Sequence, residues 1–202
     1  MKYFKSKRNI VLLNRGVVEK YHASVEAAAY EAEMLRKLHK NGLAVPRLIS
    51  LEENLVKMEY IAGLTLPDLI DKWEAKPPSS DAVNFVAEGL IIWLANFYAA
   101  TGTENCGRGD INGRNFIFDG EKIWGIDFED HAAESAEADI ALLAAYILTY
   151  NPTNTPLKQA LTARILQQAA EILNLDPGTL ETRHQEEIAK LKTRRQAKFD
   201  RK

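Results

Sequence analysis

Short apolar runs separated by polar turns dominate the first part of the chain. Residues 9–13 and 17–22 are two such runs on either side of Asn14-Arg15-Gly16, which predicts a β-hairpin. Two further runs within residues 45–61 surround the polar segment 52–54 and predict two more strands. The chain is therefore expected to begin with a β-rich region.

One strongly periodic segment interrupts this β-rich region. Apolar side chains recur at helical spacing over residues 24–40, with Ser24 as a possible N-cap and Gly42 just past the end. A shorter helix is expected at residues 67–75. The first of these helices separates the two predicted strand pairs in the sequence.

Residues 82–100 predict a long helix, with Ser80 or Asp81 as its N-cap. Apolar side chains cover most of its circumference, which is typical of a helix buried at the centre of a protein. Helical patterns return after an acid-rich stretch. The expected later helices cover residues 137–150, 156–174 and 178–199.

The order of these elements predicts an α+β fold. A β-rich N-terminal lobe, residues 1–59, and a mainly helical C-terminal lobe, residues 60–202, are expected to form a single domain over residues 1–202. The lobes would meet near residues 59–63, and a cleft between lobes is where a ligand usually binds.

The stretch GRGDINGRNFIFDGEKIWGIDFED, residues 107–130, contains a predicted hairpin. Asp119-Gly120 lies between two apolar runs, which is a strong hairpin signal. If this pair is a two-residue turn, the register of the strands places Asp127 opposite Asn112. Residues that are far apart in this stretch are therefore expected to lie close together.

The hairpin would gather the side chains of Asp110, Asn115 and Asp127. Two carboxylates and an amide, without His or Cys, suit a hard cation such as Mg²⁺ rather than zinc. The alternative, from spacing alone, is a surface hairpin with solvated acids. The segment Arg108-Gly109-Asp110 also matches a tripeptide known from cell-adhesion ligands, but Asp110 is better explained as part of this site.

Composition limits the class of protein only broadly. The 202 residues are 46% hydrophobic and 27% charged with a net charge of −2, which neither indicates nor excludes a nucleic-acid partner. No apolar run approaches the ~20 residues that span a bilayer. The single cysteine, Cys106, is expected to be inert, excludes an intramolecular disulfide and favours a reducing, cytoplasmic location.

The spacing of Asp110 and Asn115, followed by Ile126-Asp127-Phe128, resembles the catalytic loop and metal motif of the protein-kinase-like superfamily. Because glycine precedes Asp110, the likeness is nearest to aminoglycoside and choline kinases and to compact atypical protein kinases. It implies a bilobal fold with ATP and Mg²⁺ (or Mn²⁺) as cofactors. It also implies Asp110 as the catalytic residue, and Asn115 and Asp127 as metal ligands.

The same resemblance implies a lysine–glutamate pair that holds the ATP phosphates. Lys20 lies on a predicted strand, on the same face as His22. Glu31 projects from the apolar stripe of the following helix, and an acid on a buried face needs a partner. Taken singly, a solvated lysine and a boundary acid are the alternatives; taken together, the two residues match the family's pair.

The segment between the lobes resembles the hinge that binds adenine. Met58 would lie at the back of the pocket, and Glu59 and Ile61 would offer main-chain groups to the adenine edge. Farther along, Asp139 resembles the aspartate that braces the catalytic loop in this family. Its alternative is an ordinary acid at the start of a helix.

Three features depart from the family pattern. No glycine-rich loop precedes Lys20. Arg108 replaces the expected histidine and could pair with Asp127 or Asp110, or contact a substrate phosphate. Glu129 takes the place of a glycine, and the short segment that follows it leaves no room for a conventional activation loop.

The C-terminal segment, residues 183–202, is basic. It is interpreted either as a solvated helix end or as a contact for RNA or an acidic partner, because compact atypical kinases of the tRNA threonylcarbamoylation machinery also have basic tails. The expected function is that of a monomeric ATP- and Mg²⁺-dependent phosphotransferase acting on a hydroxyl of a protein Ser/Thr or of a small molecule. Two alternatives stay open: a degenerate kinase-like scaffold, and a kinase or ATPase subunit of a tRNA-modification-type complex.

Overall fold

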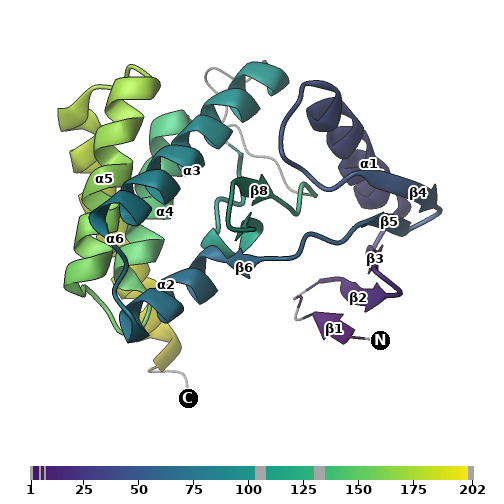
Figure 1. Cartoon of the computed structure of the whole chain (residues 1–202), viewed down its shortest axis with the longest axis horizontal. Helices are drawn as coiled ribbons and strands as arrows, with labels where there is room; N and C mark the ends of the chain where they lie inside the picture. Colours follow the sequence, from purple (N-terminus) through teal and green to yellow (C-terminus); the bar gives the residue numbers. More distant parts are fainter. Residues whose placement is uncertain (1, 5, 7, 103–107, 130–134, 200–202) are drawn as a thin grey trace.

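A β-sheet from the N-terminal part of the chain lies beside a group of helices from the remainder (Figure 1). This α+β arrangement is the one the sequence predicts. The computed structural model describes residues 2–4, 6, 8–102, 108–129 and 135–199. The prediction for Cys106 falls outside these residues.

Five antiparallel strands form the N-terminal sheet in the order β1-β2-β3-β5-β4. Both predicted hairpins are present, because the apolar runs and polar turns that define them are regular. The first strand was not predicted, since three residues are too few to show a pattern. The strands are β1 (Lys2–Phe4), β2 (Ile10–Asn14), β3 (Val17–Tyr21), β4 (Leu48–Glu52) and β5 (Leu55–Glu59).

Helix α1 (Val25–Lys40) packs its apolar stripe against β4 and β5. The hydroxyl of Ser24 accepts the N–H of Ala27 at 3.2 Å and caps the helix, as predicted. Gly42 has a φ of +79°, a left-handed conformation that favours glycine after a helix end. Glu31 is among the buried residues of this helix, so the stripe carries an acid into the protein interior.

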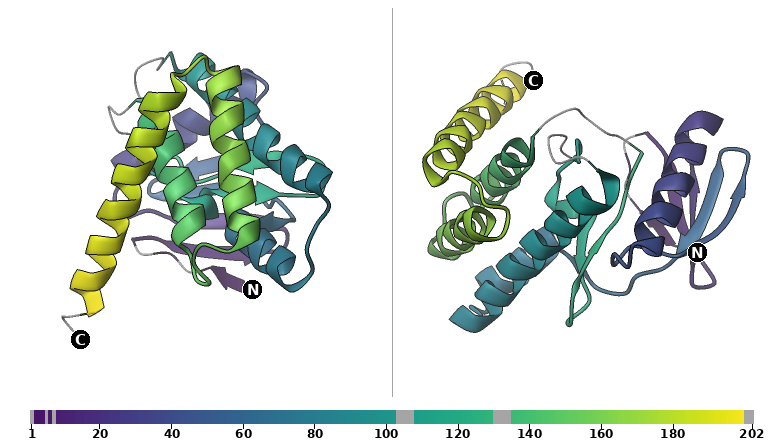
Figure 2. Two further views of the ribbon diagram at one scale, coloured as in Figure 1. Left: turned by 90° about the vertical axis from the view of Figure 1, so that its left-hand side faces the viewer. Right: turned by 90° about the horizontal axis from the view of Figure 1, so that it is seen from above.

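The helical part is built around α3 (Ser80–Thr101), whose buried side chains form much of the core. Its N-cap is Ser79, one or two residues earlier than predicted, because the Ser79 hydroxyl accepts the N–H of Ala82 at 3.2 Å. Helices α4, α5 and α6 lie side by side on the far side of α3 (Figure 2). The remaining helices are α2 (Leu66–Ala75), α4 (Ala136–Thr149), α5 (Pro156–Ile172) and α6 (Pro177–Phe199).

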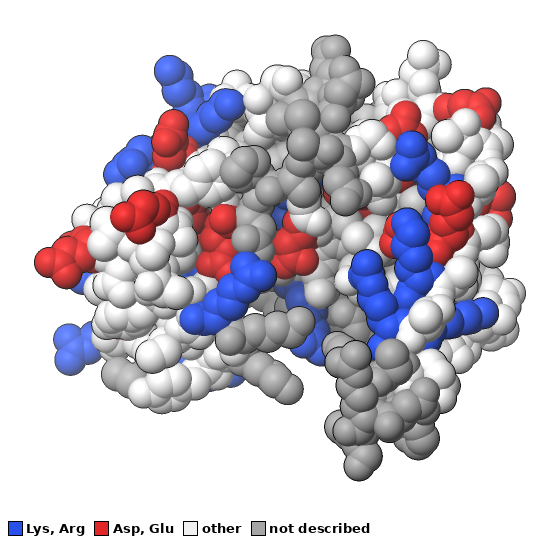
Figure 3. Space-filling model, turned by 180° about the vertical axis from the view of Figure 1, so that it is seen from behind, with Lys and Arg blue, Asp and Glu red and all other residues white. Residues whose placement is uncertain are grey.

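Among the described helices, only α3 is long and apolar enough to cross a membrane by length and composition. Its apolar side chains pack against α5, α1 and the hairpin described next. We therefore treat α3 as a core helix. On the surface, Lys and Arg side chains gather over the helical part near the C-terminal end of the chain (Figure 3).

The acid-rich stretch forms a short hairpin, but its turn lies one residue later than predicted. Asp119 caps the turn instead of forming its centre: Oδ1 accepts the N–H groups of Glu121 and Lys122 at 2.8 and 2.9 Å. The central pair is therefore Gly120-Glu121, and Phe118 is paired with Ile123. The sheet has the order β6-β7-β8, from β6 (Leu64–Thr65), β7 (Phe116–Phe118) and β8 (Ile123–Gly125).

This shift also corrects the expected position of Asp127. The N–H of Ile126 donates to the carbonyl of Asn115 at 2.9 Å, so Asp127 follows directly after the partner of Asn115 and is not opposite Asn112. A short 3-10 turn, η1 (Gly113–Asn115), precedes β7 and places Asn115 at the start of the hairpin. The hairpin still brings Asp127 back to Asn115.

Candidate active site

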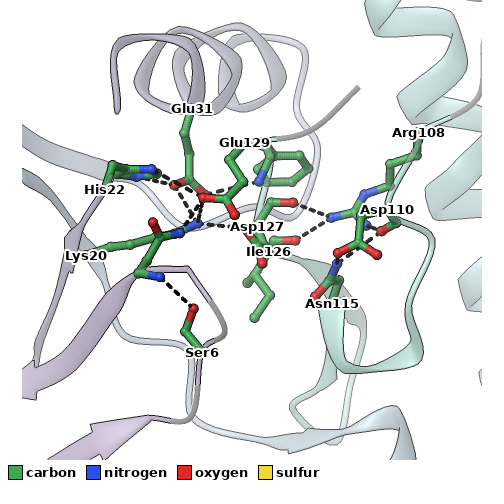
Figure 4. Close-up of polar contacts among 12 residues, drawn as sticks. Ser6, Lys20, His22, Glu31, Arg108, Asp110, Asn115, Ile126, Asp127 and Glu129 are labelled. Atoms are coloured by element: carbon green, nitrogen blue, oxygen red, sulfur yellow. Dashed lines mark hydrogen bonds and ion pairs between the residues drawn. The ribbon is translucent and has the colours of Figure 1, made fainter. Parts of the chain in front are cut away.

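Lys20 on β3 lies at the centre of a cluster of charged side chains (Figure 4). Its Nζ lies 2.6 Å from Oδ1 of Asp127, 2.9 Å from Oε2 of Glu31 and 3.4 Å from Oε2 of Glu129. Burial alone would lower the pKa of Lys20, but the charges of Glu31 and Asp127 raise it above its ordinary value. Lys20 is therefore a charged residue held in place by acids, and the pairing with Glu31 expected from the sequence is present.

Glu31 connects the helix, the sheet and the segment that follows β8. Its Oε1 accepts the N–H of Phe128 at 3.1 Å, and its Oε2 lies 2.8 Å from Nε2 of His22. Burial alone would raise the pKa of Glu31, but His22 and Lys20 lower it below its ordinary value. The carboxylate is therefore ionised although it is fully buried.

Asp127 is held in an uncommon backbone conformation. Its φ is +65°, a left-handed value that costs free energy in a residue other than glycine and persists only where the surroundings hold it. Burial raises the pKa of Asp127, and the charge of Lys20 opposes this shift. The side chain of Asp127 is 35% exposed, so a ligand can reach it.

Arg108 joins the loop before η1 to the end of the hairpin. Its guanidinium donates to the main-chain carbonyls of Asp110 at 2.6 Å and Asp127 at 3.1 Å, and also to that of Ile126. Its Cζ lies 5.1 Å from the centre of the Phe128 ring. The expected pairing with the two aspartates thus involves their carbonyls, not their carboxylates. Since only 3% of Arg108 is exposed, it can serve neither as a substrate-phosphate contact nor as an adhesion signal.

Asp110 and Asn115 contact each other, and Arg108 also contacts Asp110. Asn115 Nδ2 donates to both the carbonyl and Oδ2 of Asp110, each at 3.1 Å, while Asp110 itself is exposed. Asp139 accepts hydrogen bonds from the hydroxyl of Tyr98 at 2.9 Å and from the main-chain N–H of Arg108. These contacts favour the bracing role for Asp139 over that of an ordinary helix acid.

The same cluster also contains Glu129, His22 and Asn9. The sequence did not predict their contacts. Oε2 of Glu129 accepts a hydrogen bond from Nδ2 of Asn9 and lies 3.3 Å from Nδ1 of His22. Contact with His22, despite partial burial, lowers the pKa of Glu129 to about 2. The only available signals were that His22 shares a strand face with Lys20 and that Glu129 stands where the family motif has glycine.

The expected hinge residues lie where the sheet leads into the helical part. Met58 is buried in β5, opposite Val18. The N–H of Glu59 donates to the carbonyl of Arg47 at 3.0 Å, so this N–H is not available to adenine. Among the described residues, none accepts the N–H of Ile61. Adenine binding by these residues stays a prediction.

The side-chain oxygens of Asp127 and Asn115 suit a hard cation whose remaining ligands come from other groups. No group of three or more His, Cys, Asp or Glu side chains with the geometry of a metal site occurs in the part of the chain that the structure describes. Mg²⁺ commonly takes only one or two protein carboxylates and completes its octahedron with phosphate oxygens and water. Asp127 and the neighbouring Asn115 are consistent with such a partial site.

The fold and the arrangement around Lys20 define a protein of the protein-kinase-like class. Within that class, the RIO domain matches residues 5–147, so the chain belongs to the RIO-domain family. The chain is also 35% identical over 98 residues to the EKC/KEOPS complex subunit BUD32 of Encephalitozoon cuniculi (strain GB-M1). That match covers 48% of this chain and 44% of the relative, so the chain matches less than half of that protein's length.

Two solved structures have the same fold. The ADP-bound aminoglycoside phosphotransferase APH(2'')-Ib has a TM-score of 0.65 and 13% identity, over 92% of this chain and 80% of that one. The amicoumacin kinase hAmiN, in complex with AMP-PNP, Ca²⁺ and Ami, has a TM-score of 0.65 and 12% identity, over 87% and 73% of the two chains. The predicted bilobal kinase-like fold is therefore confirmed.

Proposed function

We propose that this protein is an ATP- and Mg²⁺-dependent phosphotransferase that transfers the γ-phosphoryl group to a hydroxyl of a protein Ser/Thr or of a small molecule. The observation that carries the proposal is the position of Lys20, whose Nζ lies between Glu31 at 2.9 Å and Asp127 at 2.6 Å. These residues come from a strand, a helix and a hairpin that are distant in sequence. Kinase-like enzymes use this arrangement to hold ATP phosphates.

Each residue of the site has a definite role in this proposal. Lys20, oriented by Glu31, binds the α- and β-phosphates. Asp110 is exposed and accepts or orients the proton of the acceptor hydroxyl. Asn115 and Asp127 hold the metal ion, which when bound neutralises charge on the phosphate oxygens. The buried contacts of Arg108 fix the main chain on both sides of the reacting groups.

Nucleotide binding and phosphoryl transfer test the proposal together. We expect millimolar ATP with Mg²⁺ to raise the unfolding temperature of the wild-type protein. Asp127→Asn, which keeps the shape of the side chain, should lose the Mg²⁺-dependent part of this shift and reduce transfer at least about a hundredfold. Asp71→Asn, at an exposed position on α2, is the matched control. A wild-type protein with no shift would favour the non-catalytic scaffold, and wild-type turnover in Asp127→Asn would refute the assignment.

A second candidate function is that of a subunit in a tRNA-modification-type complex. It is favoured by the similarity to a protein that is named as an EKC/KEOPS subunit and by the basic side chains over the helical part (Figure 3). Lys192 and Arg194 are exposed on α6, so their replacement by Gln should leave the fold intact. This double variant should bind tRNA more weakly and with a smaller salt dependence than wild type. Unchanged tRNA binding would exclude this contact.

A further inference from the structure

The Glu129 carboxylate lies among nitrogen-bearing side chains from β3 and from the residues that flank β2 and β3. A single oxygen, Oε2, accepts from Nδ2 of Asn9 and lies 3.3 Å from Nδ1 of His22 and 3.4 Å from Nζ of Lys20. The Glu129 side chain is only 15% exposed, so water does not replace these partners. One negatively charged oxygen therefore has a hydrogen bond from Asn9 and ion-pair contacts with His22 and Lys20, and Figure 4 shows the last two residues beside Glu129.

Lys20 does not need this third carboxylate. Glu31 and Asp127 already lie closer to its Nζ, at 2.9 and 2.6 Å. A further acid adds repulsion between like charges in a partly dry site. The contacts with His22 and Asn9 offset that repulsion, so these two residues, together with Lys20, favour an anion at this position.

A phosphate oxygen has the chemistry to replace the Glu129 carboxylate. Both are anionic acceptors of charge-assisted hydrogen bonds, and a nucleotide phosphate carries more charge and more acceptor oxygens. Lys20 is the residue to which the proposed function assigns the ATP phosphates. Asn9 immediately precedes β2, in the region where a glycine-rich loop is absent, and its side-chain amide can supply the donor that main-chain N–H groups provide in other kinases.

We propose that Asn9, His22 and Lys20 form a binding site for a phosphate oxygen of the nucleotide, and that Glu129 fills this site until the nucleotide displaces it. The inference rests on the proposed function, because it takes a nucleotide as the ligand. It assigns phosphate contacts to Asn9 and His22. It makes Glu129 an internal competitor whose removal strengthens nucleotide binding.

Calorimetric titration with ADP in the presence of Mg²⁺, and with adenosine, tests the competition. Glu129→Gln and Glu129→Gly should bind ADP at least about tenfold more tightly than wild type, since binding no longer has to displace a charged side chain. Affinity for adenosine, which has no phosphate, should stay the same. Glu121→Gln, at an exposed position in the hairpin turn, is the charge-matched control. Glu129 variants that bind ADP no more tightly than Glu121→Gln, or that gain as much for adenosine, would overturn the proposal.

The proposed contacts of Asn9 and His22 with phosphate are tested in the Glu129→Gln background, where the competing side chain is uncharged. Adding Asn9→Ala or His22→Gln should weaken ADP binding several-fold to about tenfold and leave adenosine binding unchanged. Asn14→Ala is the control, because the side-chain amide of Asn14 on β2 donates to Oε1 of Glu19 at 3.1 Å and, among the described residues, has no hydrogen bond to Lys20, His22 or Glu129. Unchanged ADP affinity in both donor variants would overturn the phosphate site.

These outcomes separate the further inference from the proposed function. If wild type binds ADP and the Glu129 variants bind it equally well, only the inference fails. If wild type and every variant fail to bind ADP and adenosine while circular dichroism shows a folded protein, the proposed function fails as well.

Discussion

The Nζ of Lys20 lies 2.6 Å from Oδ1 of Asp127, although the two residues are 107 positions apart in the sequence. Lys20 belongs to the N-terminal sheet, whereas Asp127 follows the hairpin that packs on α3. The contact therefore exists only when the two parts of the molecule are packed together. Glu31 strengthens this connection, because it contacts Lys20 and also the N–H of Phe128.

Glu31→Gln should damage both activity and stability. The amide has the same shape but carries no charge, so it leaves Lys20 less well oriented and the buried site less well balanced. We expect phosphoryl transfer to fall roughly a hundredfold and the free energy of unfolding to fall by about 1–3 kcal/mol. Glu33→Gln on the exposed face of α1 is the control. Equal kinetics and equal urea midpoints for the two variants would contradict the role of Glu31.

Replacement of Arg108 by Met or by Lys should lower the stability of the protein. The guanidinium donates to the carbonyls of Asp110 and Asp127 at once, a geometry that an ammonium group cannot reproduce. Arg108→Met leaves these buried acceptors without a donor and should cost about 3 kcal/mol or more, with Arg108→Lys intermediate. Arg114→Lys, at an exposed position, should cost little. Urea unfolding of the variants measures these differences, and a fully stable Arg108→Met would show that the carbonyl contacts contribute nothing.

Elements with long or regular patterns could be predicted from the sequence. Helix α1 and the two N-terminal hairpins follow from apolar periodicity and turn residues over many positions. Strands β1 and β6 have only three and two residues, too few for any period to be visible. The turn at Asp119 was misplaced by one residue because its side chain accepts two main-chain N–H groups, a preference that the Asp-Gly signal does not show.

The candidate site also contains residues that the sequence predicted and residues that it did not. Lys20, Glu31 and Asp127 could be predicted because their motifs match a known family, and the structure brings them into contact. The contacts of Glu129 with Asn9 and His22 could not be predicted, because they join segments up to 120 positions apart that carry no recognisable motif. For the same reason the sequence suggested side-chain partners for Arg108, whereas main-chain carbonyls, which every residue has, accept its hydrogen bonds.

The stability of the protein should depend on pH through His22. Burial alone would lower the pKa of His22, but Glu129 and Glu31 raise it above its ordinary value of 6.5, while Lys20 opposes them. A pKa raised in the folded state stabilises the fold fully below pH 6.5, and this contribution is lost as the pH rises through the folded value. The free-energy difference between wild type and His22→Gln should therefore be larger near about pH 6 than near about pH 9. His39→Gln, at an exposed position at the end of α1, controls for other titrations. A difference that is constant with pH would show that His22 does not gain protons on folding.

Two glycines on facing elements should respond to alanine in opposite ways. A Cβ at Gly125 on β8 would lie closer than 3.0 Å to three atoms of the Trp93 ring. That ring cannot retreat easily, since its Nε1 donates to the carbonyl of Ala44 at 2.9 Å and its face stacks on Phe97. Gly125→Ala should therefore lower the free energy of unfolding by about 3 kcal/mol.

Gly89 is the comparison for Gly125, because it lies on α3 and faces the same hairpin. A Cβ there would be 3.4 Å from Cγ1 of Ile123, which is an ordinary contact. Since alanine restricts the unfolded chain and favours the helix, Gly89→Ala should raise the free energy of unfolding by about 0.5–1 kcal/mol. Thermal and urea unfolding of both variants measure the contrast. If both substitutions destabilised the protein equally, the close approach of Trp93 to β8 would not be the cause of the effect at Gly125.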